Sequence, residues 1–198
     1  MNIRPATRAD SADIVILDDI ASSGLASHVL EVGVRDGRYD RPLEFGRDGY
    51  AFIDGPFSWK NVLIAETEDG IAGMSLSFEL TGGPGDQDLS DPVLDPLEAL
   101  KAKAIGTRLI DSVAVYTRFR GQGIGRALVE AELSRATGPS SIITHDTNTR
   151  ALSLYQSLGF EEQRRAAYVA FSKNHAAAQW VLLTRPALQS RGAQTSVQ

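Results

Sequence analysis

The sequence contains no cysteine, and this absence removes several kinds of chemistry at once. Disulfide bonds, thiolate catalysis and cysteine-based metal sites are all excluded. The chain also lacks any apolar run approaching the roughly 20 residues of a membrane-spanning helix. Its first residues, Met1 to Asp10, carry two arginines but no apolar stretch, so they do not resemble a secretory signal. We therefore expect a cytoplasmic protein with no membrane partner.

Basic residues are in the minority. The chain has 20 lysines and arginines against 25 aspartates and glutamates, for a formal net charge of −5. A general nucleic-acid binder normally needs a basic face, so no nucleic-acid partner is expected. An acidic surface suits a cationic amine substrate, although only weakly. The histidines, His28, His145 and His175, are scattered along the chain, so no metal site is expected.

The 198 residues are enough for one domain with its own hydrophobic core. We expect a single domain over residues 1–186, followed by a polar tail over residues 187–198. Residues 81–96 are rich in Gly, Pro and Asp, and with a short helix at 96–104 they predict a lid-like loop inserted at residues 81–104.

Hydrophobic periodicity and turn signals predict alternating strands and helices. The segment Glu68-Asp69-Gly70 is a hairpin signal between two apolar runs. This order of elements indicates an α+β fold, with a mixed sheet covered partly on both faces. The predicted strands are residues 2–6, 61–66, 71–80, 107–116, 141–144, 167–172 and 179–184, and the predicted helices are residues 14–21, a broken stretch within 25–50, 96–104, 123–136 and 148–158.

The most informative segment is a glycine-rich turn between a predicted strand and a predicted helix, with glycines at positions 121, 123 and 125. Glycine allows positive φ and close approach of the backbone to a ligand. The first N–H groups of the helix have no partner within it and lie at the positive end of its dipole. Together these features predict a phosphate-binding site, and Arg118, Arg120 and Arg126 form a local basic cluster beside it.

Other interpretations of this turn remain open on these residues alone. The glycines fit a tight strand–helix connection with no ligand, because short glycine motifs are weak signals. A dinucleotide-binding fingerprint fits poorly, because the spacing is Gly-x-Gly-x-Gly and no acidic residue ends a strand about 20 residues further on. A P-loop fits worse, because no Gly-Lys-Ser/Thr follows.

Two segments together resemble the GNAT superfamily, the Gcn5-related N-acetyltransferases. The turn Arg120-Gly121-Gln122-Gly123-Ile124-Gly125 matches motif A of that family, Arg/Gln-x-x-Gly-x-Gly/Ala, although Thr117 stands where many members have proline. The segment from Asn148 to Phe160 resembles motif B, Asn-x-x-Ala-x-x-Leu-Tyr-x-x-x-Gly-Phe. The resemblance implies a central, mostly antiparallel sheet of six to seven strands with helices on both faces.

The resemblance also implies the donor and its binding residues. The donor would be acetyl-CoA, used as a substrate, and the acceptor an amine, with no metal required. A homodimer would be compatible with the family. The implied donor-binding residues are the preceding strand (Val113, Ala114, Val115), the turn (Arg120, Gly121, Gln122, Gly123, Ile124, Gly125), Arg126 at the helix start, and Asn148, Ala151 and Tyr155 in the second block.

Tyr155 is the proton donor to the departing thiolate that the resemblance implies, although a hydrogen-bonded core tyrosine would look the same. The general base is open between an ordered water chain and the carboxylates on the predicted central strands, Asp111, Glu79 and Glu66. Asp111 is favoured, because alternation places it on the same strand face as Val113. His145 is a weaker candidate for a proton relay, since a surface histidine explains it equally well.

We expect direct attack of the amine on the thioester in a ternary complex, with a backbone N–H near Val115 stabilising the oxyanion. The alternative is a catalytically silent acyl-CoA-binding module of the same fold. The acceptor matches no pattern. Aromatic residues in the region expected to bind it would suit a hydrophobic acceptor or simple core packing: Phe45, Tyr50, Phe52, Phe57 and Trp59.

Overall fold

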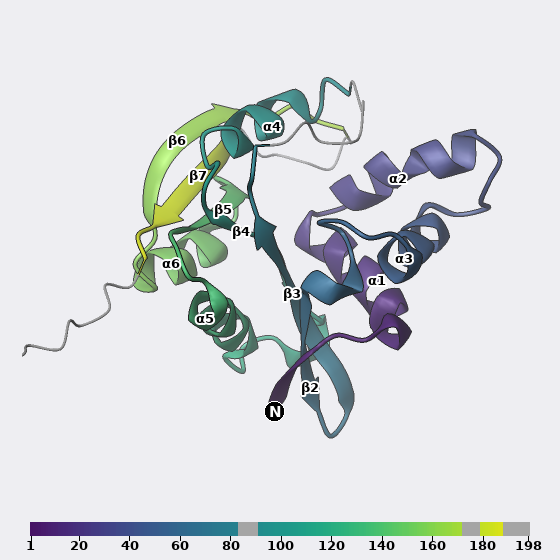
Figure 1. Cartoon of the computed structure of the whole chain (residues 1–198), viewed down its shortest axis with the longest axis horizontal. Helices are drawn as coiled ribbons and strands as arrows, with labels where there is room; N and C mark the ends of the chain where they lie inside the picture. The colour runs from purple at the N-terminus through teal and green to yellow at the C-terminus, as the bar shows by residue number, and fades with distance from the viewer. Residues whose placement is uncertain (83–90, 172–178, 188–198) are drawn as a thin grey trace, which may run out of the picture.

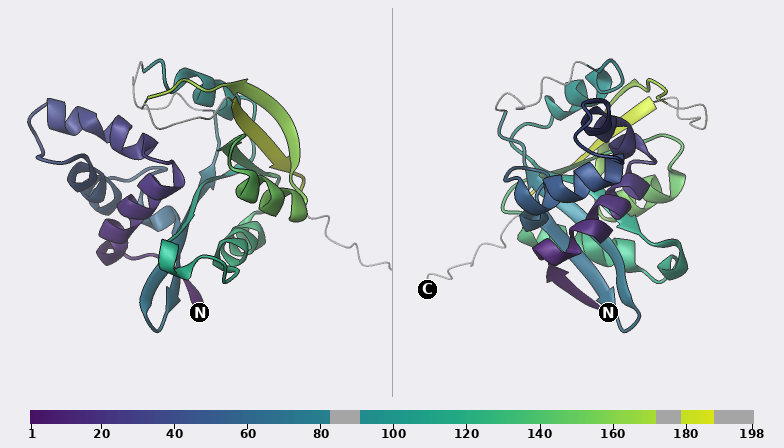
Figure 2. Two further views of the ribbon diagram at one scale, coloured as in Figure 1. Left: turned by 180° about the vertical axis from the view of Figure 1, so that it is seen from behind. Right: turned by 90° about the vertical axis from the view of Figure 1, so that its right-hand side faces the viewer.

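The protein folds around a seven-stranded sheet whose strand order is β1-β2-β3-β4-β5-β7-β6 (Figure 1). The computed structural model describes residues 1–82, 91–171 and 179–187. Helices lie on both faces of the sheet, which confirms the predicted α+β class (Figure 2). The strands are β1 (Asn2–Pro5), β2 (Val62–Thr67), β3 (Gly70–Glu79), β4 (Arg108–Val115), β5 (Ser140–His145), β6 (Glu161–Ala167) and β7 (Gln179–Arg185), and the helices are α1 (Ser11–Ala21), α2 (Leu25–Arg35), α3 (Pro42–Phe52), α4 (Asp95–Lys101), α5 (Ile124–Arg135) and α6 (Thr149–Ser157).

The sheet is antiparallel except at its centre, where β4 and β5 run parallel. That parallel pair is short: only Arg108↔Ser140 and Leu109↔Ser141 are in register. All other neighbouring strands pair antiparallel over longer stretches. The described sheet is therefore two antiparallel halves, joined at one end of β4 and diverging toward its other end.

A β-bulge interrupts β4 just beyond this short parallel pairing. Leu76 of β3 is opposite Ser112, but the next residue, Ser77, is opposite Ile110, which leaves Asp111 as an extra residue in β4. A bulge of this kind changes the direction of the side chains around it. The simple alternation assumed from the sequence therefore breaks at Asp111.

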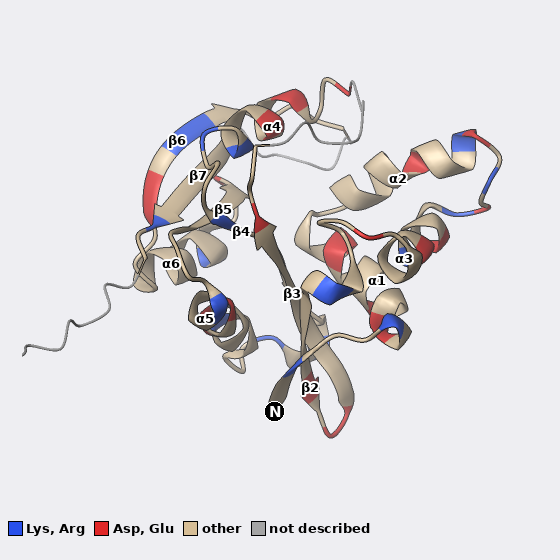
Figure 3. Ribbon diagram, viewed as in Figure 1, with Lys and Arg blue, Asp and Glu red and all other residues tan. Residues whose placement is uncertain are grey.

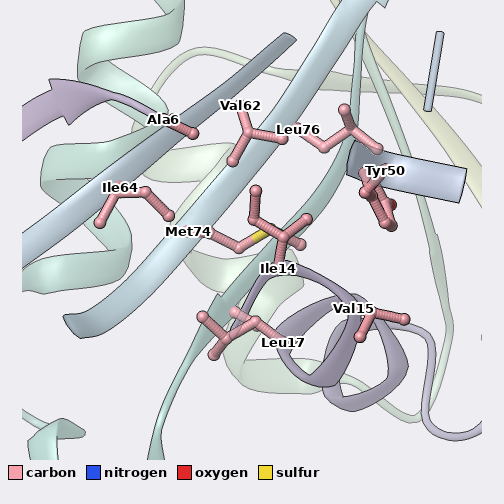
Figure 4. Close-up of a cluster of buried hydrophobic side chains, with 10 residues drawn as sticks. Ala6, Ile14, Val15, Leu17, Tyr50, Val62, Ile64, Met74 and Leu76 are labelled. Atoms are coloured by element: carbon pink, nitrogen blue, oxygen red, sulfur yellow. The ribbon is translucent and has the colours of Figure 1, made fainter. Parts of the chain in front are cut away.

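One hydrophobic cluster packs α1 and α3 against β2, β3 and β4 (Figure 4). Ile14 and Leu17 of α1 and Met74 of β3 are fully buried there. α1 has apolar residues at helical spacing, and this stripe meets the alternate residues of β3 that face the same way. The packing fixes the face of β4 that carries Ala114.

The opposite face of the sheet is covered by α5 and α6. Apolar residues of these helices form one cluster with β4, β5 and β7, and those of α5 form another with β2, β3 and β4. α5 is held to β3 by Glu132, which is completely buried. Its carboxylate accepts hydrogen bonds from Ser75 Oγ at 2.7 Å and Ser77 Oγ at 2.6 Å. Arg108 Nη2 lies 3.6 Å from the same carboxylate. These contacts fix the helix that follows the glycine-rich turn.

One strand lies earlier in the sequence than predicted. The strand expected at residues 167–172 lies earlier, as β6 (Glu161–Ala167), and no strand follows at residues 168–171. β6 is charged and exposed along most of its length and pairs only with β7, so it lacks the apolar pattern used for the prediction. The expected helix near Pro96 is present as α4, whereas residues 83–90 of the lid-like loop and residues 188–198 of the tail lie outside the described residues.

Within the described ranges, none of the helices combines the length and apolar character needed to cross a membrane.

Candidate functional site

The glycine-rich turn has the backbone geometry expected of an anion site. Gly121 and Gly123 have φ of 79° and 80°, and Gly123 is the N-cap of α5. The first bond of the helix ladder runs from Ala127 N to Gly123 O at 3.1 Å. Among the described residues, no hydrogen-bond acceptor faces the N–H groups of residues 121–126. A row of free N–H groups at a helix start favours binding of phosphate.

The three arginines expected to form a basic cluster beside the turn each donate to a different segment of the chain. Arg118 lies over the Phe119 ring, with Cζ 4.6 Å from the ring centroid, and donates to Asp69 O. Arg120 Nε donates to Val115 O at 3.1 Å. Arg126 Nη2 donates to Ser157 Oγ at 2.7 Å, which ties α5 to the end of α6. Backbone N–H groups, more than arginine side chains, therefore define the anion site.

The backbone of β4 exposes polar groups toward the divergence from β5. Tyr116 N donates to Ala72 O, and the register places Ala114 opposite Met74. In an antiparallel pair, residues between two hydrogen-bonded positions direct their N–H and C=O away from the partner strand. Val113 and Val115 therefore direct these groups toward β5, which has no registered partner for them. An extended ligand arm would fit along this edge.

Tyr155 lies on α6 in the hydrophobic cluster that also contains Ile110 and Ile142, from β4 and β5. It is 8% exposed, and its hydroxyl makes no hydrogen bond with any described residue. Burial raises the pKa of Tyr155 to about 12. The phenol therefore stays protonated at neutral pH, but its pKa is further from the ordinary thiol value, about 8.5, than the sequence argument assumed.

Asn148 is the N-cap of α6, as its position before the helix predicted. Its Oδ1 accepts from Ala151 N at 3.3 Å, and its Nδ2 lies 3.5 Å from Thr144 Oγ1. Ala151 packs at the edge of the cluster that holds Tyr155. These contacts position α6 beside the divergence of β4 and β5.

Asp111 does not lie on the face that alternation predicted. Val113 packs toward α5 and α6, but the Asp111 carboxylate contacts Ser112 Oγ at 3.3 Å, on the face covered by α1. The bulge is the reason, because it turns two consecutive side chains, Asp111 and Ser112, to the same side. The Asp111 carboxylate and Tyr155 therefore lie on opposite faces of the sheet, on either side of the divergence.

A partly buried polar cluster surrounds Asp111, and of its other members the sequence had singled out only Tyr50. Asp18 of α1 accepts from Ser112 Oγ at 2.6 Å and from Tyr50 Oη at 2.9 Å. Burial raises the pKa of the Asp18 carboxyl to about 6, and the nearby Asp111 adds to this effect. Lys101 Nζ lies 3.9 Å from Asp111 Oδ1. Figure 3 shows acidic segments in both α1 and β4, the elements that supply the two carboxylates.

The one signal in the sequence for this cluster was Asp18 itself. It follows Ile14 by one helical turn and so lies on the apolar face of α1, where an acid is unusual. Its partners Ser112 and Lys101 lie far away in sequence, and no local pattern brings them together.

Glu79 and His145 lie away from this cluster. Glu79 is exposed at the end of β3 and pairs with Arg108, with Nη1 3.2 Å from its carboxylate. This is the end of β4 where the two halves of the sheet are joined. His145 ends β5, and its Nδ1 lies 2.9 Å from Thr147 Oγ1. The structure therefore brings Asp111, and not Glu79, close to the divergence of the strands.

The aromatic residues expected near an acceptor do not form one pocket. Tyr50 is buried in the core beneath α1, and Trp59 packs at the edge of the same cluster. Phe45 stacks near Tyr39, with ring centroids 5.0 Å apart. Phe52 and Phe57 are exposed. The described residues also contain no group of three or more side chains that could hold a metal ion.

Comparisons with known proteins agree with this geometry. The acetyltransferase (GNAT) domain profile matches residues 58–162, which include β4, the turn, α5 and α6. No curated protein sequence matches the chain significantly.

Solved structures share the fold at low sequence identity. A crystal structure of an acetyltransferase is 18% identical, with a TM-score of 0.65, covering 95% of this chain and 100% of that one. An N-acetyltransferase from Staphylococcus aureus Mu50 is 20% identical, with a TM-score of 0.63 and coverage of 93% and 100%. A ribosomal-protein alanine N-acetyltransferase from Escherichia coli is 15% identical, with a TM-score of 0.59 and coverage of 97% of each chain.

The family profile covers more than half of the chain, and the part that it covers contains the unpartnered N–H groups, the diverging central strands and the two motif blocks. This chain belongs to the GNAT family and is an acetyltransferase.

Proposed function

We propose that the protein transfers an acetyl group from acetyl-CoA to a primary amine, by direct attack in a ternary complex. The observation that carries this proposal is the row of unpartnered N–H groups at residues 121–126, located where β4 and β5 have diverged. In this proposal these groups bind the pyrophosphate of the donor, because a helix N-terminus with free N–H groups favours an anion.

The pantetheine arm of the donor would then run between β4 and β5. Support comes from the carbonyl of Val113 and the N–H of Val115, which face β5 without a registered partner there. The carbonyl of Val115 already accepts from Arg120, so it is not available to the arm. From the turn, the arm would point toward the closed end of the divergence, where the last registered pair is Leu109↔Ser141.

At the closed end of the divergence, the Asp111 carboxylate lies on one face of the sheet and Tyr155 lies on the other. In the proposed reaction, Asp111 accepts a proton from the acceptor ammonium on the α1 side. The freed lone pair attacks the thioester carbonyl carbon, and the developing oxyanion accepts a hydrogen bond. We assign that hydrogen bond to Val113 N–H, the gap-facing donor nearest to Asp111, in place of the group near Val115 that the sequence suggested.

The leaving group is protonated from the other face of the sheet, which carries Tyr155. As the C–S bond breaks, the thiolate receives a proton from Tyr155, whose hydroxyl has no competing hydrogen bond among the described residues. The carboxylates of Asp18 and Asp111 favour an acceptor that arrives as a cation.

An assay of free thiol release from acetyl-CoA, with a panel of primary amines, tests the proposal. The variant Tyr155→Phe should lower kcat by about 10² to 10⁴, the range of general acid catalysis, and leave KM for acetyl-CoA almost unchanged. The matched control is Tyr39→Phe. Tyr39 lies between α2 and α3, and the substitution removes a hydroxyl that donates to the Asp48 carboxylate of α3. Its kinetics should equal those of the unmodified protein.

Two results would contradict the proposal in different ways. If CoA raises the melting temperature but no amine releases thiol, the chain is the catalytically silent binding module. If a dinucleotide stabilises the protein and CoA does not, the turn binds another ligand.

A further inference from the structure

The ammonium group of Lys101 lies in the polar cluster at the closed end of the divergence. Lys101 is the last residue of α4, and its side chain is 17% exposed. Its Nζ is 3.9 Å from Asp111 Oδ1 and 3.0 Å from Glu98 Oε1. A lysine side chain is rarely buried to this extent unless its charge is paired.

The other described lysines differ from Lys101. The sequence contains four lysines, at positions 60, 101, 103 and 173. Lys60 and Lys103 are exposed. Lys60 pairs with Asp54 on the surface, with Nζ 2.6 Å from Oδ1. Among the described lysines, Lys101 alone has its ammonium beside the carboxylate to which we assign the base role.

The position of Asp111 places this ammonium near the reacting end of the donor. Asp111 is the bulge residue of β4, two residues beyond the last registered pair with β5. A strand rise of about 3.4 Å per residue puts Asp111 roughly 14 Å from Val115, where the turn begins. A donor arm that starts at the turn and runs along β4 therefore ends near Asp111 and Lys101.

Like an external primary amine before it reacts, the Lys101 side chain carries a positive charge. Burial alone lowers the pKa of Lys101, but the carboxylates of Asp111 and Glu98 outweigh this effect, so the pKa is raised overall. The side chain is thus an ammonium at neutral pH, and it needs a base to become a nucleophile, as does any external primary amine.

We propose that Lys101 occupies the place of the acceptor amine and is itself acetylated by this enzyme when no external amine competes. This inference rests on the function proposed above. The Lys101 ammonium loses a proton to Asp111, and its Nζ forms a bond to the acetyl carbonyl carbon. The C–S bond of acetyl-CoA breaks, the thiolate takes a proton from Tyr155, and the second proton lost by the nitrogen restores the Tyr155 hydroxyl. The products are an acetylated Lys101, free CoA thiol and one released proton.

The product would differ from the resting side chain in charge. An acetylated Lys101 is a neutral amide and no longer pairs with Asp111 or Glu98. The carboxylates of Asp18 and Asp111 would then lack the cation that faces them now. Before acetylation, external amines would compete with Lys101 for the same position.

Peptide mass spectrometry of the full chain after incubation with acetyl-CoA alone tests the inference. A protease that cleaves beside acidic residues leaves the peptide bonds beside the lysines intact, whether or not they are acetylated. The exposed Lys60 and Lys103 report the background of non-enzymatic acetylation. We expect Lys101 to gain one acetyl group at least tenfold faster than Lys103, with a first-order rate constant independent of protein concentration. An added reactive amine should slow this gain, and Tyr155→Phe should reduce it.

The variant Lys101→Arg keeps a cation beside Asp111 and serves as the control, since it should gain no acetyl group at this position. The inference is overturned if Lys101 is acetylated no faster than Lys103 while external amines are acetylated normally, because Lys101 would then be only a counter-ion. If acetyl-CoA is neither bound nor turned over, the inference and the proposed function fail together.

Discussion

The buried carboxyl of Asp18 makes a quantitative prediction about stability. Burial raises its pKa from 3.8 to about 6 in the folded protein. A difference of about 2 pKa units corresponds to about 3 kcal/mol, at 1.36 kcal/mol per unit. Because the folded pKa is the higher one, this stabilisation is fully present below the unfolded pKa and is lost as the pH rises through about 6.

The variant Asp18→Asn removes this titration and keeps an oxygen that can accept from Ser112 or Tyr50. The free energy of unfolding of the variant, minus that of the unmodified protein, should therefore rise by about 2.5 kcal/mol between pH 4 and pH 7.5, because part of the full difference has already developed at pH 4, just above the unfolded pKa of 3.8. Urea denaturation at a series of pH values measures both quantities, and subtraction removes the contribution of every other group.

If the difference in free energy of unfolding for Asp18→Asn does not change with pH, the reasoning is refuted. It would mean that hydrogen bonds from Ser112 and Tyr50 compensate the desolvation of Asp18 and hold it ionised at little cost. A falling difference would mean that Asp18 is stabilised as an anion by a cation, for which Lys101 is the nearest candidate in this cluster.

Three further predictions concern the turn, the helix behind it and the base. Gly123→Ala places a side chain at φ 80° with no atom within 4 Å of its Cβ, so it should cost about 1–2 kcal/mol by denaturation, through backbone strain alone, and weaken CoA binding. Glu132→Ala leaves the hydroxyls of Ser75 and Ser77 without their buried acceptor and should lower the free energy of unfolding by about 3–5 kcal/mol. Asp111→Asn should lower kcat by about 10² to 10⁴ and change the pH dependence of the rate, and unchanged values of both would exclude Asp111 as the base.

Local patterns predicted the parts of the site that depend on neighbouring residues. Glycine spacing located the turn, because positive φ at Gly121 and Gly123 is a local requirement. The hairpin of β2 and β3 followed from Glu68-Asp69-Gly70, and Asn148 was found at the start of α6 because capping is also local.

Contacts between distant segments could not be predicted in this way. The bulge at Asp111 depends on the register of β3 against β4, which no single strand reveals, and it reversed the expected face of that side chain. The arginines near the turn were close in sequence, but each found a partner on a different element. The hydrogen bond from Ser112 Oγ to the Asp18 carboxylate joins two segments that lie far apart in the sequence.

The short pairing between the two halves of the sheet affects how the chain folds and opens. The half made of β1 to β4 lies before the turn, and the half made of β5, β7 and β6 lies after α5. Each half is continuous in sequence and pairs its strands antiparallel, whereas in the described sheet the two halves share only two registered pairs of residues. In hydrogen exchange, the seam between them should therefore behave as a separate cooperative unit, whose amides become accessible at a lower opening free energy than those within either half.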